Sequence, residues 1–273
     1  MLKEILENVR EKVPLIHSIT NYVTANDCAN ILIASGARPI MADDIDEICE
    51  ITSICDGLNI NLGILNSKKA SAMIAAAKKA DELKHPILLD PVGVGTSRLR
   101  IKTVKELLEN VKFTVIRGNV SEIKSLAGKS VNTSGVDADV TDCINEKNLL
   151  ETVGLAKDFA LKTGAIIVVT SKTDIVTDGR QVYCAYNGDI MMSKISGSGC
   201  QLSAMMTAYI AANKDDVLKA ALGAVSAMGI CGEIAKKRMN KFDGNASFRN
   251  YLIDAVYNLS PEDLEREARY EIG

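Results

Sequence analysis

Histidine is scarce in this chain, and cysteine is scattered along it. The two histidines, His17 and His85, lie far apart among 273 residues and provide no ligand cluster for a metal of the zinc type. Cysteine shows neither CxxC spacing nor the density of a small disulfide scaffold, so we expect the reduced thiols of a cytosolic protein. The seven cysteines are Cys28, Cys49, Cys55, Cys143, Cys184, Cys200 and Cys231.

The sequence also lacks a basic block, an apolar run of membrane-spanning length and a signal-peptide core. Net charge is −3 and the pI is about 5.6, with lysines and acids interspersed, which argues against nucleic acid and acidic membranes as partners. The first ten residues mix acids with apolar side chains, and no later apolar run is long enough to cross a bilayer. We therefore expect a soluble, cytoplasmic protein.

Neither an internal repeat nor a long linker divides the chain. With 273 residues and 47% hydrophobic content it can bury a sizeable core as one large domain or as two small ones. We favour a single domain over residues 1–273.

Short apolar runs alternate with longer amphipathic ones. This order builds a mostly parallel central sheet with helices on both faces, a three-layer α/β/α fold. The clearest helix is expected over Ser67–Lys84, and its five lysines are interpreted as a solvated face. Strands are expected at Leu58–Leu62, Pro86–Asp90, Phe113–Arg117 and Ala165–Thr170.

The pattern changes after Thr170. Asp174–Thr177 and Gln181–Cys184 flank an Asp-Gly turn, which predicts a hairpin and an antiparallel edge of the sheet. From Gln201 onward the pattern is helical throughout, and the many alanines and glycines in Ala220–Gly229 predict very close helix packing. Lys129–Asn148 is the one long polar connection, and we expect it to form a mobile surface loop.

A glycine-rich turn, Ile195–Cys200, runs directly into the predicted helix that begins at Gln201. Gly197 and Gly199 allow backbone N–H groups to close around phosphate oxygens, and the first helical turn adds unpaired donors and the positive end of the helix dipole. We expect that field to lower the pKa of the Cys200 thiol. A tight loop with a buried cysteine is the alternative that this turn leaves open.

Polar residues at the ends of predicted strands supply further candidates, because ligands of such sheets collect there. Asp90 is a candidate magnesium ligand, with an Asx turn or a cap as the alternative. Glu122 lies three residues after Asn119 and either approaches a metal-bound phosphate or turns back on the backbone in a capping box. Arg117 and Thr170 are candidate phosphate ligands, since a guanidinium fork matches phosphate geometry and a hydroxyl group reaches it. For Thr170, a hydroxyl group that simply closes a turn is the alternative.

The order of these motifs resembles the ribokinase-like superfamily, and within it the hydroxyethylthiazole kinase family. The resemblance covers nearly the whole chain. Cys200 favours this family, because sugar kinases and most vitamin kinases of the superfamily carry an aspartate at that position. The matching segments are His17–Asn26, Gly36–Ala42, Asn59–Gly63, Asp90–Gly95, Arg117–Ile123 and Gly197–Cys200.

The resemblance implies an ATP-dependent kinase that phosphorylates the hydroxyethyl group of 4-methyl-5-(2-hydroxyethyl)thiazole. Its product would be 4-methyl-5-(2-phosphooxyethyl)thiazole, an intermediate of thiamine biosynthesis and salvage. The resemblance also implies a homotrimer with the thiazole site at subunit interfaces, and it implies magnesium as the metal. By family position, Met41, Gly197 and Asn21 would contact the thiazole, Arg117 and Thr170 the ATP phosphates, Asp90 and Glu122 would organise Mg²⁺, and Gly197, Gly199 and Cys200 would act in catalysis.

Phosphoryl transfer passes through a loose transition state, so a strong general base is optional. We therefore expect Cys200 to align the primary hydroxyl group and to share its proton late. Two other functions remain open at this point. One is a ribokinase-like vitamin kinase acting on pyridoxine or hydroxymethylpyrimidine, and the other is a nucleotide- or ligand-binding module without turnover.

Overall fold

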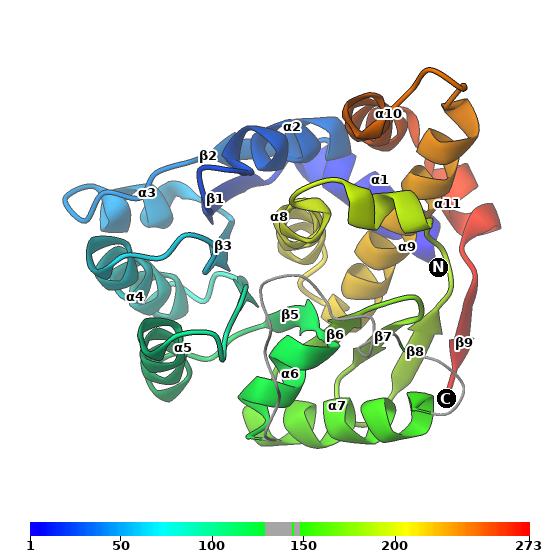
Figure 1. Cartoon of the computed structure of the whole chain (residues 1–273). Coiled ribbons are helices and arrows are strands. Elements are labelled where there is room, and N and C mark those ends of the chain that lie inside the picture. The colour runs from blue at the N-terminus through cyan, green and yellow to red at the C-terminus, as the bar shows by residue number, and fades with distance from the viewer. Residues whose placement is uncertain (129–143, 145–147) are drawn as a thin grey trace.

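The computed structural model describes residues 1–128, 144 and 148–273, and within them it forms a nine-stranded sheet (Figure 1). The first six strands of the chain pair in parallel and the last three pair antiparallel. Their order across the sheet is β2 (Arg38–Ile40), β1 (Leu15–Ile19), β3 (Gly57–Asn61), β4 (Ile87–Asp90), β5 (Val115–Asn119), β6 (Ile166–Thr170), β7 (Asp174–Thr177), β8 (Val182–Ala185) and β9 (Tyr270–Ile272).

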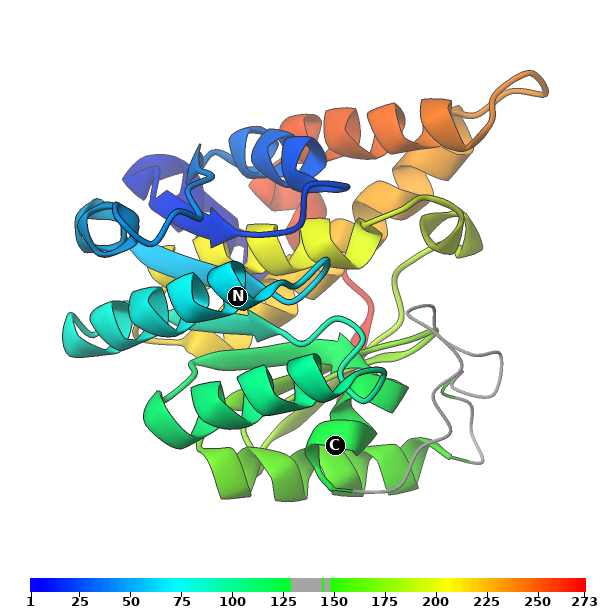
Figure 2. The ribbon, with the colours of Figure 1, turned by 60° about the vertical axis from the view of Figure 1, so that its left-hand side comes forward.

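Helices cover both faces of this sheet, which confirms the expected three-layer α/β/α fold (Figures 1 and 2). One layer contains α1 (Leu2–Lys12), α2 (Ala25–Ser35), α8 (Ser198–Ala212), α9 (Val217–Arg238), α10 (Asn245–Asn258) and α11 (Pro261–Glu267). The other contains α3 (Ile48–Ile54), α4 (Ser67–Glu82), α5 (Arg98–Asn110), α6 (Val120–Leu126) and α7 (Leu149–Thr163). A short 3₁₀-helix, Ile190–Lys194, precedes α8.

The strands are apolar because both of their faces are covered. Successive side chains of a strand point to opposite faces, so Leu88 enters the core beneath α8 and α9, while Leu89 enters the core beneath α4 and α5. Such strands read as continuous apolar runs, and the four expected ones are present. β5 continues to Asn119, two residues beyond the expected end at Arg117, because Gly118 and Asn119 remain paired with β6.

Helix α4 occupies almost the span that the sequence predicts, and the Asn66 side chain caps it by accepting a hydrogen bond from the Lys69 amide at 2.9 Å. The interpretation of all five lysines as a solvated face is wrong for Lys69, which is only 8% exposed. Its ammonium group donates to the Thr20 carbonyl oxygen and pairs with Asp43 Oδ2 at 3.2 Å. This lysine therefore ties α4 to the segments that follow β1 and β2.

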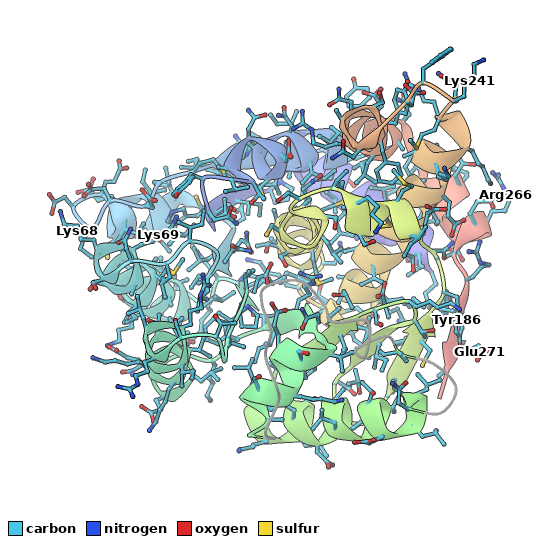
Figure 3. All side chains as sticks on the ribbon, in the orientation of Figure 1. Lys68, Lys69, Tyr186, Lys241, Arg266 and Glu271 are labelled. Carbon is cyan, nitrogen blue, oxygen red and sulfur yellow. The ribbon has the colours of Figure 1, made fainter. Side chains whose placement is uncertain are left out.

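The hairpin expected after Thr170 is present as β7 and β8, but β8 is not the edge of the sheet. The terminal strand β9 pairs antiparallel with β8, so the expectation of helix from Gln201 to the end of the chain is wrong there. The Tyr186 hydroxyl group donates to Glu271 Oε2 at 2.8 Å beside this edge (Figure 3). Three residues are too few to show a strand period, so only pairing with β8 reveals this element.

Helix α9 packs as closely as its small residues predict. A Cβ atom added at Gly229 would lie 2.6 Å from the Asn187 carbonyl oxygen. Among the described residues, α9 is the one helix long and apolar enough to cross a membrane, and 78% of its apolar window is buried within the protein. Its apolar character is therefore that of a core helix. The polar connection expected to be a mobile loop, Lys129–Asn148, lies outside the described residues apart from Ile144 and Asn148.

Candidate active site

The carboxyl ends of the parallel strands meet the N-terminus of α8. β3 and β4 pair Asn61 with Asp90, and β5 and β6 pair Asn119 with Thr170, so these residues stand in adjacent positions at one edge of the sheet. Helix α8 contacts β1, β3 and β4 (Figure 2). It begins at Ser198, three residues earlier than expected, which places Cys200 within its first turn.

Both glycines of the turn lie against close neighbours. Gly197 has φ +81°, and a Cβ atom there would lie 2.2 Å from Thr24 Cγ2. A Cβ atom at Gly199 would lie 2.5 Å from Arg117 Nη1. The guanidinium group therefore lies directly against the first turn of α8, so a fixed cation and the positive end of a helix dipole share one location.

Arg117 and Thr170, the two candidate phosphate ligands, are in direct contact. Arg117 Nη2 donates to Thr170 Oγ1 at 2.6 Å, and Arg117 Nε is buried without a hydrogen-bond partner in the described part of the chain. Arg117 also approaches Asp90 Oδ2 with Nη1 at 3.6 Å. Among the described residues, the arginine thus retains one N–H donor without a partner.

Asp90 is completely buried. Its Oδ2 atom accepts from Asn61 Nδ2 and from Ser203 Oγ, each at 2.8 Å, so side chains rather than an Asx turn hold this oxygen. Its Oδ1 atom has no hydrogen-bond partner among the described residues. Burial raises the pKa of Asp90, and the neighbouring Arg117 charge opposes that rise.

Glu122 forms the capping box that was one of its two expected arrangements. Glu122 Oε2 accepts from the Asn119 amide at 2.8 Å, while Asn119 Oδ1 accepts from the Glu122 amide at 2.8 Å. Glu122 Oε1 accepts from the Gly93 amide at 2.9 Å, which ties the loop after β4 to α6. Burial, with a smaller contribution from Asp90, raises the pKa of Glu122 to about 7.

The Cys200 sulfur receives two amide donors. Asn61 Nδ2 lies 3.2 Å from Cys200 Sγ, and Asn21 Nδ2 lies 3.6 Å from the same atom. The expected lowering of the thiol pKa is wrong for the ligand-free protein, because burial and then the charge of Asp90 raise the pKa of Cys200 to about 11. In this state the thiol keeps its proton at neutral pH.

The expected thiazole contacts divide into a buried and an exposed part. Asn21 is buried, and its Oδ1 atom accepts from the amides of Val23 and Thr24 at 3.1 Å each. Met41 directly follows β2 near the edge of the sheet and is 36% exposed. His17 is a buried histidine, with Nδ1 at 3.0 Å from Thr52 Oγ1 and Nε2 at 3.0 Å from the Ala42 carbonyl oxygen.

Sequence reasoning missed the side chains that connect these groups, namely Asn61, Ser203 and Lys69. Two of the three carried a signal. Asn61 ends a predicted strand, like Asp90, and Ser203 lies three residues after Cys200 on the same helix face. No local pattern distinguishes Lys69 from the four other lysines of its segment.

The comparisons with known proteins agree on one family. The model of the hydroxyethylthiazole kinase family matches residues 6–262. This chain belongs to that family. A hydroxyethylthiazole kinase of Clostridium acetobutylicum is 59% identical over 271 residues, which is 99% of each chain. A hydroxyethylthiazole kinase of Clostridium tetani is 44% identical over 97% of this chain and 95% of its own.

Solved structures show the same relationship. The hydroxyethylthiazole kinase of Pyrococcus horikoshii OT3 superimposes with a TM-score of 0.88 at 33% identity, covering 100% of this chain and 98% of its own. A pyridoxal kinase of Staphylococcus aureus reaches a TM-score of 0.63 at 17% identity, covering 96% of this chain and 98% of its own, and shares the fold alone. The family membership therefore rests on the matches to hydroxyethylthiazole kinases. The likeness to the pyridoxal kinase is a likeness of fold.

Proposed function

We propose that the chain transfers the terminal phosphoryl group of ATP to the hydroxyethyl group of 4-methyl-5-(2-hydroxyethyl)thiazole, forming 4-methyl-5-(2-phosphooxyethyl)thiazole for thiamine biosynthesis and salvage. The observation that carries this proposal is the position of Cys200 in the first turn of α8, with the Arg117 guanidinium packed on Gly199 of the same turn. This arrangement supports stabilisation of a transferred phosphoryl group, with the Cys200 thiol beside it as a partner for the acceptor hydroxyl group. The chain belongs to the hydroxyethylthiazole kinase family.

Arg117 and Thr170 are the proposed ligands of the ATP phosphates. The guanidinium group supplies directed N–H donors and a positive charge, and the first turn of α8 supplies backbone donors. Because Gly199 has no side chain, the guanidinium group packs against this turn and brings the two sets of donors together. Positioning and charge stabilisation of this kind account for most of the catalysis of phosphoryl transfer.

Asp90 and Glu122 are the proposed residues that organise Mg²⁺, and the structure supports the two differently. Asp90 Oδ1 is a buried carboxylate oxygen without a partner, which suits a hard cation. Both oxygens of Glu122 already accept backbone N–H groups, so this side chain fits a contact through water. When bound, Mg²⁺ would neutralise charge on the phosphate oxygens, as is usual for kinases that hold it with few carboxylates.

Cys200 is proposed to align the primary hydroxyl group of the thiazole alcohol, with Met41, Asn21 and Gly197 around the thiazole. A thiol with a pKa of about 11 is a poor general base in the free protein. A loose transition state needs only a late proton acceptor, so alignment of the hydroxyl group is the main contribution of Cys200. Gly197 and Gly199 let Thr24 and the Arg117 guanidinium group pack directly against this turn.

The assembly is also part of the proposal. Tyr22 and Val23 are 78% and 59% exposed directly beside the buried Asn21, which supports a thiazole site completed by a neighbouring subunit. The resemblance to the family, rather than this exposure, is the ground on which we propose a cytoplasmic homotrimer of one kinase domain per chain, residues 1–273. Its substrates are small molecules, ATP and the thiazole alcohol.

The test is product formation from ATP, Mg²⁺ and the thiazole alcohol, followed by mass spectrometry. We expect a phosphorylated thiazole that disappears when EDTA replaces Mg²⁺. Pyridoxine and hydroxymethylpyrimidine serve as competing acceptors in parallel reactions. A phosphorylated pyridine or pyrimidine without thiazole phosphate would show that the substrate is another alcohol. Absence of any phosphorylated product with all three alcohols would contradict the proposed kinase activity.

A further inference from the structure

Asn61 occupies the position between the two groups that the proposed reaction needs most. It ends β3, is completely buried and stands in register with Asp90 on β4. Its amide nitrogen lies 2.8 Å from Asp90 Oδ2 and 3.2 Å from Cys200 Sγ. One rigid amide group therefore contacts both the carboxylate proposed for Mg²⁺ and the thiol proposed for the alcohol.

The backbone determines which way this amide points. The Gly63 N–H group can only donate, and it lies 3.0 Å from the Asn61 side-chain atom that must therefore be Oδ1. Asn21 Nδ2 donates to the same oxygen at 3.1 Å. The two hydrogens of Asn61 Nδ2 are consequently left for Asp90 and Cys200. Both the oxygen and the nitrogen of this amide therefore have two hydrogen-bond partners.

The orientation of Asn21 is determined in the same way. Its Oδ1 atom accepts from the Val23 and Thr24 amides, so its nitrogen faces Asn61 Oδ1 and Cys200 Sγ. Two amide nitrogens thus donate to one sulfur, which acts as a hydrogen-bond acceptor toward both. The thiol proton is directed away from this pair of amides.

We propose that Asn61 is a positioning residue for phosphoryl transfer. It holds the Cys200 sulfur and the Asp90 carboxylate at a fixed separation and acts on the reaction step rather than on alcohol binding. The inference rests on the proposed function, because it assigns Asn61 a role through Cys200 and Asp90. Displacement of reacting groups by about 1 Å costs on the order of 100-fold in rate, so loss of this shared contact predicts a large effect on kcat.

The variant that tests this role is Asn61→Ala, and Asn59→Ala is its matched control. Asn59 lies two residues earlier on β3, faces the same side of the sheet and is equally buried. Its Nδ2 atom donates to Ser18 Oγ at 2.9 Å, so its amide serves a different partner from that of Asn61. Both substitutions remove the same atoms from the same strand.

We expect Asn61→Ala to lower kcat for thiazole phosphate formation by roughly 100-fold, with KM for the alcohol within about threefold of the unsubstituted chain. The dissociation constant of the alcohol, measured by calorimetry, should likewise change by less than about threefold in Asn61→Ala. The control Asn59→Ala should keep both kcat and KM. If Asn61→Ala fails to fold by circular dichroism, Asn61→Ser takes its place, because its short hydroxyl group fills part of the space. A tenfold loss of alcohol binding with kcat unchanged would overturn the proposal.

A double-mutant cycle tests the connection to Cys200. If Asn61 acts through the thiol, the fold loss of kcat caused by Asn61→Ala should be smaller in a Cys200→Ala background than in the unsubstituted chain. We expect the two losses to differ by a factor of about three or more. An equal loss in both backgrounds would contradict that connection. Absence of thiazole phosphate from the unsubstituted chain would count against the proposed function, whereas normal product formation by both that chain and Asn61→Ala would overturn the positioning role alone.

Discussion

At the scale of single residues, the site consists of polar groups that are buried yet largely satisfied by one another. Asp90, Asn61 and Cys200 form a connected set in which side-chain donors replace water. A partner removed from such a set leaves a buried polar atom unpaired, which costs more than the hydrogen bond itself contributed. Substitutions here are therefore expected to have larger effects than substitutions of exposed residues.

Cys200→Ala is expected to lower kcat by roughly 100-fold, because the hydroxyl group loses the partner that aligns it for transfer. Cys200→Asp should remain active or improve, since a carboxylate can align the hydroxyl group and also accept its proton. The measurement is the rate of thiazole phosphate formation, with Cys55→Ala as a control at a buried cysteine outside the site. Full turnover by Cys200→Ala would remove the thiol from the catalytic mechanism, and an inactive but folded Cys200→Asp would contradict the carboxylate equivalence.

Asp174 predicts a pH dependence of stability. Burial raises the pKa of Asp174 to about 7, whereas an unfolded aspartate titrates near pH 4. Between these values the folded chain binds the proton and the unfolded chain does not, so the free energy of unfolding falls as pH rises and then levels off above about pH 7.

Asp174→Asn should remove that fall. Between pH 5 and pH 7.5, its free energy of unfolding should therefore rise by about 2 kcal/mol relative to that of the unsubstituted chain. The asparagine can still accept the hydrogen bond that the Ser171 amide donates to Asp174 Oδ1 at 2.8 Å. Urea unfolding at the two pH values measures the difference, with Asp178→Asn at the turn of the same hairpin as the control. Parallel pH curves for the unsubstituted chain and Asp174→Asn would contradict the assignment.

At the scale of elements, the site depends on how α4, β1 and β2 are held together. Lys69 in the first turn of α4 donates to the Thr20 carbonyl oxygen, one residue before Asn21, and pairs with Asp43, two residues after Met41. Figure 3 marks Lys69 beside its neighbour Lys68 on this helix. A single buried ammonium group thus connects the two segments proposed to contact the thiazole.

Lys69→Met is expected to raise KM for the alcohol roughly tenfold and to leave kcat within about threefold, because hydrogen bonds to a charged group contribute about 1.5 to 3 kcal/mol. Methionine preserves the buried length of the side chain but provides no donor. Lys68→Met is the matched control, since Lys68 is exposed on the same helix. Steady-state kinetics separate the two constants, and a selective loss of kcat would assign Lys69 to the chemistry instead.

At the scale of the whole molecule, the proposed site at a subunit interface would link activity to assembly. The exposed Tyr22 and Val23 lie beside Asn21, so a partner subunit covering them would complete the thiazole pocket. Specific activity should then fall on dilution at the concentration where the oligomer dissociates, because free subunits lose part of the pocket. Mass photometry and activity assays over the same dilution series test this link, and constant specific activity across monomerisation would refute it.

The strands β3 to β6, the hairpin after β6 and helix α4 follow from the sequence because their signals are local. Buried parallel strands require continuous apolar runs, and an Asp-Gly turn selects a hairpin. The sequence also makes Asp90, Arg117, Thr170 and Cys200 candidate site residues, because strand ends and a glycine-rich helix start are where such sheets bind ligands. The short strands β2 and β9 carry too few residues for a period to appear.

Only the tertiary structure decided how those residues meet and what their surroundings do to them. The Asn61 amide contacts Cys200 across 139 positions of sequence, and Lys69 reaches the Thr20 carbonyl oxygen from another layer, neither of which any spacing predicts. The thiol pKa shows the same division. The sequence places Cys200 at a helix N-terminus, which lowers a pKa, but burial beside Asp90 raises it to about 11, because desolvation depends on everything packed around the sulfur.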